Sequence, residues 1–186
     1  QMPSDIVGEY QSANPNKFLF DGDSNWYGDN EKTFLSSPGQ LPHHFTIDLG
    51  VKTTLRKVKI DMPDHTLFNK NNVTSVQIWG REDLSNAETN SSSETDFINA
   101  GWKLLHEENI DGENLSNDSF IVQPSSRKVR YIRYRVTSTV ENISSQLTEL
   151  TFYGQDNEPI THDRSQYSII PMQSDNPGNF YGAQPQ

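Results

Sequence analysis

Oxygen-bearing side chains alternate in a short stretch near the start of the chain, where Asp21, Asp23 and Asn25 occupy every second position of residues 18–26. Carboxylate and amide oxygens at this spacing are suitable ligands for a hard cation such as calcium. Gly22 lies between the carboxylates and can supply an unusual backbone angle. The same pattern is also typical of an Asx turn that needs no metal. The residues therefore leave two interpretations open, a metal-braced rim beside a binding site and a polar turn.

A second group of residues could bind a sugar, because it combines aromatic rings with planar hydrogen-bonding groups. Aromatic residues follow the Asp turn directly, and a polar loop over residues 61–72 adds a histidine, a phenylalanine and amides. Ordinary structural roles are the alternative for each member, such as capping the fold, a solvated histidine or a weak surface ion pair. The candidate set is Trp26, Tyr27, His65, Phe68, Asn69 and Arg81.

Motifs for catalysis are missing from the sequence. It contains no Gly-x-Ser-x-Gly elbow, no His-Glu-x-x-His and no phosphate-binding glycine loop. His43 and His44 are neighbours in an extended segment, so their side chains diverge and a shared metal is not expected. Glu107 and Glu108 are adjacent in the chain, whereas glycosidase carboxylates face each other across a cleft. We therefore expect a protein that is not an enzyme.

The composition excludes several classes of protein. The chain has 186 residues, a net charge of -10 and no cysteine, which excludes disulfides, thiolate metal sites and a catalytic thiol. An acidic chain has no overall electrostatic footprint for nucleic acid or an anionic membrane. One basic strand stands out, with Arg130, Arg133 and Arg135 near Lys128. It could be a stripe for nucleic acid or glycosaminoglycan, but we favour cross-strand pairing with the many acidic residues.

Hydrophobic periodicity predicts short strands and no long helix. Residues 83–99 are rich in Ser, Asn, Glu and Thr, which indicates a mobile insertion, and residues 107–113 are expected to form an acidic loop. Trp79 and Trp102 are expected to pack in a β-sandwich or on its face. We divide the chain into a lead-in segment (1–17), a β domain (18–154) and a polar tail (155–186), draped over the domain or acting as a linker. The predicted strands are 18–20, 45–49, 55–60, 73–79, 102–105, 120–122, 129–136 and 150–153.

An ordered set of motifs resembles a known family. It consists of Phe-Asp21-Gly-Asp23, Phe45-Thr-Ile-Asp-Leu-Gly50, Val76-Gln-Ile-Trp-Gly80, Arg130-Tyr-Ile-Arg133 and Glu149-Leu-Thr-Phe-Tyr-Gly154. Over roughly residues 18–154 the chain resembles a discoidin domain, also called the coagulation factor 5/8 type C domain, and is similar to family 32 carbohydrate-binding modules. In their exact residues, these motifs are most similar to C-terminal domains of Bacteroidetes surface proteins from glycan-utilisation systems. Vertebrate members usually close the domain with a disulfide, which a chain without cysteine cannot form.

The resemblance implies an all-β fold, a galactose-binding-like jelly-roll sandwich of about eight antiparallel strands. It also implies a structural calcium ion between the early Asp turn and the start of the last strand. The carboxylates would come from Asp21, Asp23 and Glu149, and backbone oxygens from Phe18, Trp26 and Thr148.

The expected function is that of a non-catalytic extracellular module that binds a glycan or glycoprotein at its loop end. A protein-interaction or adhesion domain, and an architectural spacer in a larger surface lipoprotein, are the alternatives. By this resemblance we expect an extracellular or outer-membrane location within a longer exported chain. The first residues are not a signal peptide, so an exported protein would have lost its signal or be one piece of a longer chain. Other surface proteins are possible partners, whereas nucleic acid and membrane insertion are not expected.

Overall fold

Ten strands and one short helix make up the described part of the protein. The structure is a computed structural model that describes residues 19–20, 22, 34–35, 41–62, 72–84, 93–110, 119–142, 145–155, 159–160 and 168–169. The helix is α1 (Glu94–Asn99). The strands are β1 (Phe34–Leu35), β2 (His43–Thr54), β3 (Lys57–Asp61), β4 (Val73–Arg81), β5 (Lys103–Asn109), β6 (Ser119–Val122), β7 (Lys128–Thr139), β8 (Gln146–Leu147), β9 (Glu149–Tyr153) and β10 (Ser168–Ile169).

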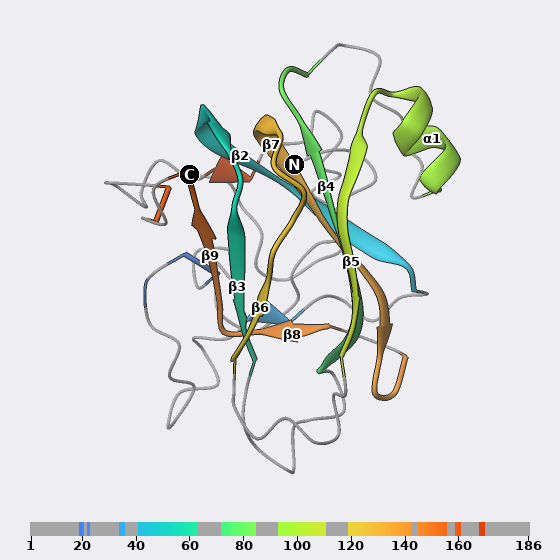
Figure 1. The fold of residues 1–186 in the computed structure, drawn as a ribbon. Helices are drawn as coiled ribbons and strands as arrows, with labels where there is room; N and C mark the ends of the chain where they lie inside the picture. Colours follow the sequence, from blue (N-terminus) through green and yellow to red (C-terminus); the bar gives the residue numbers. More distant parts are fainter. Residues whose placement is uncertain are drawn as a thin grey trace, which may run out of the picture.

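The strands form two main sheets that face each other (Figure 1). The larger sheet has the strand order β10-β2-β7-β4-β5, and the smaller has the order β6-β3-β9. β1 and β8 form a separate two-stranded pair. Neighbouring strands in these sheets are antiparallel throughout. Figure 1 shows the smaller sheet packed across the larger one, which confirms the predicted antiparallel β-sandwich.

The inner core lies between the two sheets and follows from alternation along each strand. Every second residue of a strand points to the same face, so one face can be apolar throughout. Ile132, Tyr134 and Val136 of β7 meet Ile60 of β3 and Phe152 of β9, and all five side chains are fully buried. Aliphatic and aromatic residues at alternate positions of the strands therefore form the core between the sheets.

Several strands extend further than the sequence predicted, among them β2 and β5. The strand expected to end at Gly50 continues to Thr54, across a bulge after Asp48. Gly50 has a φ of 73° and donates its N–H to Asp48 Oδ1 at 2.8 Å, so glycine turns the strand without ending it. The prediction of an acidic loop over residues 107–113 was also wrong at its start, because Glu107 lies in β5 and pairs there with Gln77 of β4.

Two segments differ in kind from their predictions. Leu19 lies in a 3₁₀ turn and Phe20 in a bend, so the strand expected over residues 18–20 is not formed by these two residues, although both are buried. Part of the expected mobile insertion is the helix α1. Ser93 caps it by accepting a hydrogen bond from the Asp96 N–H at 3.2 Å. Tertiary packing and this cap stabilise a helix that composition alone did not predict.

The described part of the tail contributes one strand to the larger sheet. Ser168 pairs with Asp48 and Ile169 with Ile47, so β10 covers the edge of β2. Within the described residues, no helix is long and apolar enough to cross a membrane.

Candidate functional site

One end of the sandwich joins the early Asp turn to the last strand. Glu149 begins β9, is 3% exposed, and pairs with Asp61 at the end of β3. The N–H of Gly22 donates to Glu149 Oε2 at 3.0 Å across 127 residues of sequence. Gly22 has a φ of 85°, a backbone angle that favours glycine. Gly22, which separates the two aspartates in the sequence, therefore lies beside the buried carboxylate that the resemblance assigned to the same site.

The oxygen atoms at this end fit a hard cation. Thr148 is fully buried, and its hydroxyl has no hydrogen-bond partner within the described residues. Its backbone N–H donates to the Asp61 carbonyl at 2.9 Å, which fixes it beside Glu149. A buried carboxylate with neighbouring oxygen donors is the kind of site that calcium prefers. The described residues alone hold no group of three or more metal-ligating side chains.

The other predicted ligands, Asp21, Asp23, Phe18 and Trp26, lie outside the described residues. The calcium site therefore stays a prediction. The contact between Gly22 and Glu149 supports its position, because Gly22 separates the two aspartates in the chain.

Of the predicted sugar-binding residues, the structure describes Arg81 alone. Trp26, Tyr27, His65, Phe68 and Asn69 lie outside the described residues. The loop that contains the last three begins after Met62 and ends before Asn72, at the end of the sandwich that carries Glu149.

Arg81 lies at the far end of β4, which begins just after Asn72. β4 has nine residues, so Arg81 is on the order of 25 Å along the strand from Val73. The described residues therefore do not bring Arg81 to the end at which this loop starts and finishes (Figure 1).

The outer face of the larger sheet is closed by a second cluster. Trp79, Phe97 and Trp102 pack together with no more than 2% exposure, beneath α1. Phe97 meets Trp79 edge to face with ring centroids 5.3 Å apart. The two tryptophans expected to pack in the sandwich or on its face are thus buried, and neither offers a surface for stacking a ligand.

The arginines of β7 belong largely to this outer cluster. Arg133 is fully buried, with its Cζ 4.6 Å from the Phe97 ring centroid and 4.5 Å from that of Trp102. Arg135 donates to Gln77 Oε1 at 2.6 Å and to Glu94 Oε1 at 2.9 Å. The alternative of an exposed basic stripe is therefore wrong for these two residues, because their charges are held inside the fold.

Arg130 pairs with an acidic residue on the neighbouring strand. It donates to both carboxylate oxygens of Asp48, at 2.8 and 3.0 Å. The Asp48 hydrogen bonds raise the pKa of the Arg130 guanidinium further above its usual value. This bidentate contact confirms cross-strand pairing for Arg130.

The adjacent histidines point into different layers. His43 contacts Ser145 Oγ through Nε2 at 2.8 Å, and burial lowers the pKa of His43 to about 4. His44 packs edge to face on Phe97, with centroids 4.9 Å apart. Burial lowers its pKa well below the usual value, and the nearby charges of Arg133 and Arg135 add to this effect. The predicted divergence of the two side chains is confirmed.

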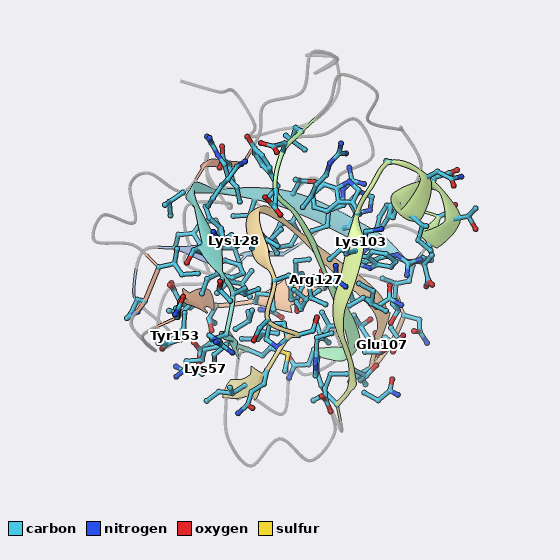
Figure 2. All side chains as sticks on the ribbon, turned by 45° about the horizontal axis from the view of Figure 1, so that its top comes forward. Lys57, Lys103, Glu107, Arg127, Lys128 and Tyr153 are labelled. Carbon is cyan, nitrogen blue, oxygen red and sulfur yellow. The ribbon has the colours of Figure 1, made fainter. Side chains whose placement is uncertain are left out.

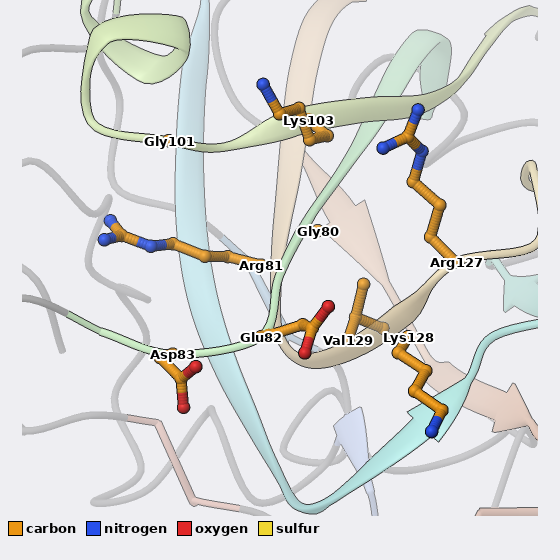
Figure 3. Close-up of a pocket in the computed structure, with 9 residues that line it drawn as sticks. All are labelled: Gly80, Arg81, Glu82, Asp83, Gly101, Lys103, Arg127, Lys128 and Val129. Carbon is orange, nitrogen blue, oxygen red and sulfur yellow. The ribbon is translucent and has the colours of Figure 1, made fainter.

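A hollow of about 470 Å³ opens at the end of the sandwich opposite Glu149 (Figure 3). It lies where β4 ends and where β5 and β7 begin, and these three strands are neighbours in the larger sheet. Its lining is Gly80, Arg81, Glu82, Asp83, Gly101, Lys103, Arg127, Lys128 and Val129.

The sequence reasoning named Arg81 and Lys128 for other roles and missed Lys103 and Arg127. Their positions at strand ends were visible in the sequence, but the order of strands in the sheet was not. Figure 2 shows Lys103 and Arg127 near each other and apart from Lys57 and Tyr153.

Comparison with known proteins places the sandwich among carbohydrate-binding modules in fold. CBM32-3 of a family 31 glycoside hydrolase from Clostridium perfringens aligns with a TM-score of 0.56 at 19% identity, covering 82% of this chain and 93% of that chain. CpGH89CBM32-5 from Clostridium perfringens, solved with GalNAc-β-1,3-galactose, aligns with a TM-score of 0.55 at 17% identity, covering 74% and 82%. The SusE-like protein BT2857 aligns with a TM-score of 0.59 at 17% identity, covering 83% of this chain and 64% of that chain.

These likenesses confirm the galactose-binding-like fold predicted from the motifs. No curated protein matches the chain. A family described as a domain of unknown function, DUF5000, matches residues 20–154. Because this match spans most of the chain, the protein belongs to the DUF5000 family.

Proposed function

We propose that this protein is a non-catalytic carbohydrate-binding module that acts outside the cell or on the outer-membrane surface, as part of a longer exported chain. Its site is the loop end beside Glu149, where Trp26, Tyr27 and Phe68 provide stacking surfaces. His65 and Asn69 provide hydrogen bonds to sugar hydroxyls. The fold supports this proposal, because similar sandwiches include a module solved with a galactose-containing disaccharide.

The burial of two of the three tryptophans is the observation that supports the position of the site. A sugar-binding sandwich needs an accessible aromatic platform. The chain has three tryptophans, and Trp79 and Trp102 are buried under α1. Trp26 follows the turn that Gly22 fixes against Glu149, so it is the tryptophan best placed in the sequence to meet a ligand at the loop end.

In this proposal calcium has a structural role. Glu149 and Thr148 would hold it together with Asp21, Asp23 and the backbone oxygens of Phe18 and Trp26. A bound cation supplies charge compensation for the carboxylates and keeps the loop beside the site in one conformation. Chelator should then lower the melting temperature, and an unchanged melting temperature would argue for a metal-free turn.

Tryptophan fluorescence tests the binding site directly. Neutral galactosides and plant or host polysaccharides are titrated into the protein, and a spectral shift is expected to come from Trp26 because the other two indoles are buried. Trp26→Ala should abolish binding measured by calorimetry, and His65→Ala should weaken it. Trp26→Phe is the matched control, since it keeps a stacking ring but removes the fluorescence change.

Binding of no glycan, or full binding by Trp26→Ala, would overturn the proposal. Weak affinity for a single module is expected from a shallow site, with gain from multivalent display.

A protein-interaction or adhesion role is the alternative, and two exposed apolar side chains favour it. Leu104 on β5 is 41% exposed and Ile121 on β6 is 54% exposed, and each strand is an edge of its sheet. Loss of binding to a protein partner by the double variant Leu104→Ser and Ile121→Ser would support the interaction role. Absence of glycan binding would agree with this role and also with that of a spacer between domains.

A further inference from the structure

The hollow opposite the loop end gathers positive charge in an acidic protein. Four cationic side chains line it, from Arg81, Lys103, Arg127 and Lys128, against two carboxylates. One of these, Asp83, pairs with Lys52 at 2.9 Å and is neutralised. The cations therefore outnumber the remaining carboxylate, Glu82, by three, whereas the whole chain carries a net charge of -10.

Three of the four cations are available to a ligand. Lys103, Arg127 and Lys128 are exposed, and none of their side chains forms an ion pair or hydrogen bond within the described residues. This contrasts with Arg130, Arg133 and Arg135, whose charges are engaged by Asp48, aromatic rings and Glu94. Within the described residues, these three cations therefore differ from the other basic residues of β7 in that no ion pair or hydrogen bond holds their charge.

The floor of the hollow is rigid and closely packed. A Cβ added to Gly80 would lie 2.6 Å from both Leu105 Cδ1 and Val129 Cγ1, so a larger residue cannot be accommodated without displacement. At the rim, a Cβ on Gly101 would lie 3.7 Å from Arg81 Cζ, which places the guanidinium against the Gly101 backbone. Gly101 has a φ of 89°, so a side chain there would also strain the backbone. The strands thus carry the cationic residues around a closely packed floor, and Figure 3 shows their side chains extending outward from it in different directions.

We propose that this hollow binds the anionic group, carboxylate or sulfate, of an acidic oligosaccharide. Its volume of about 470 Å³ is in the range of small-molecule sites and suits one or two sugar rings. Lys103, Arg127 and Lys128 bind the anion, and Glu82 accepts hydrogen bonds from sugar hydroxyls. The overall negative charge opposes densely charged polymers such as nucleic acid or an anionic membrane, whereas an oligosaccharide with separated charges meets less repulsion.

The proposal of this second site rests on the proposed glycan-binding role only in its choice of an oligosaccharide as the ligand. It lies at the other end of the sandwich from Glu149, so the two sites can be tested independently. Calorimetry is used with trigalacturonate for the carboxylate, a sulfated heparin disaccharide for the sulfate and a neutral galactose trisaccharide as the reference. Oligothymidylate tests nucleic acid.

Charge-removing variants give opposite expected results. Lys103→Gln with Arg127→Gln should weaken binding of the acidic sugar about tenfold or more, because two charged contacts are lost. Glu82→Gln should strengthen it about twofold to fivefold, since the amide oxygen still accepts hydrogen bonds from sugar hydroxyls while a repulsive carboxylate is removed. A folding defect does not produce tighter binding. Lys57→Gln is the matched control, because it removes a charge from β3 in the other sheet and should leave binding unchanged.

The outcomes separate the two sites. The proposal is supported if Lys103→Gln with Arg127→Gln loses binding of the acidic sugar and Trp26→Ala keeps it. This holds whether or not any neutral glycan binds. Acidic-sugar binding that is lost in Trp26→Ala but kept in Lys103→Gln with Arg127→Gln overturns it. The absence of any binding to both acidic sugars also overturns it, and tighter binding of oligothymidylate through the same residues would replace it with a nucleic-acid site.

Discussion

The inner core and the outer cluster are equally buried but are built from different chemistry. The inner core is mainly aliphatic and lies between two sheets whose strands alternate regularly. The outer cluster joins three aromatic rings to Arg133 and adds a polar network of Arg135, Gln77 and Glu94. Apolar burial stabilises the first, whereas the second also depends on cation–π contacts and charged hydrogen bonds.

This difference explains where the protein can recognise a ligand. In many antiparallel sandwiches one face of a sheet is solvated. Here α1 and its aromatic cluster cover part of that face on the larger sheet. Both sites proposed above therefore lie at the ends of the sandwich, one beside Glu149 and the other at the basic hollow.

Truncating the inner core should have the largest effect. Phe152→Ala removes a fully buried ring from β9 and should lower the free energy of unfolding by about 4 kcal/mol. Chemical denaturation measures this loss. Signals from the outer tryptophans should be lost in the same transition, because α1 has no sheet to pack on once the sandwich opens. A transition in which the tryptophan signal survives would contradict this dependence.

Truncating the outer cluster should have a smaller and more local effect. Phe97→Ala removes the ring that contacts Trp79, His44 and Arg133, and we expect a loss of about 3 kcal/mol. Hydrogen exchange should increase in α1 while the central strands β2 and β7 stay protected. Equal loss of protection in both regions would show that the two layers form one cooperative unit.

The histidine that faces the inner core should make stability depend on pH. Because burial lowers the folded-state pKa of His43 to about 4, the unfolded chain binds the proton more readily below pH 6.5. Stability is therefore full above pH 6.5 and falls as the pH drops towards 4, by about 2 kcal/mol between pH 7 and pH 5. Unfolding at several pH values should show a shallower fall for His43→Gln. The pH dependence of stability that remains in His43→Gln is expected to come from His44, which lies in the outer layer.

Loss of the charged contact to α1 should have the smallest effect. The hydrogen bond from Gln77, and then that from Arg135, lower the pKa of Glu94. The stability from this carboxylate is present above its unfolded pKa and is lost as the pH falls below 4.5. Glu94 is half exposed, so Glu94→Gln should cost less than about 1 kcal/mol at pH 7. A larger cost in thermal unfolding would show that the network supports more than the helix.

The sequence predicted the inner core well and the outer cluster poorly. Alternation in β4 and β7 identified the buried face correctly, because period-two patterns directly reflect which side of a sheet is apolar. The opposite face carries Gln77, Arg133 and Arg135, which periodicity treats as solvated. Only the packing of α1 buries them, and the signal for that helix was local, the spacing of Ser93 and Asp96 at its start.

The candidate sites show the same limit. The motif order placed Glu149 beside the Gly22 turn, and the structure brings those two residues into contact. Arg81 was grouped with His65, although the predicted strand over residues 73–79 lies between them and sets them at its opposite ends. The basic hollow was beyond sequence reasoning for a different reason, since it depends on β4, β5 and β7 being neighbours in the sheet.

The pairing of β10 with β2 has a consequence for handling the protein. The family match ends at residue 154, so a protein shortened to residues 20–154 would lack Ser168 and Ile169 and would expose the backbone of Ile47 and Asp48. An open strand edge is a template for pairing with a second copy. The shortened protein is therefore expected to self-associate in light scattering where the full chain stays monodisperse, so the segment after the family boundary also protects solubility.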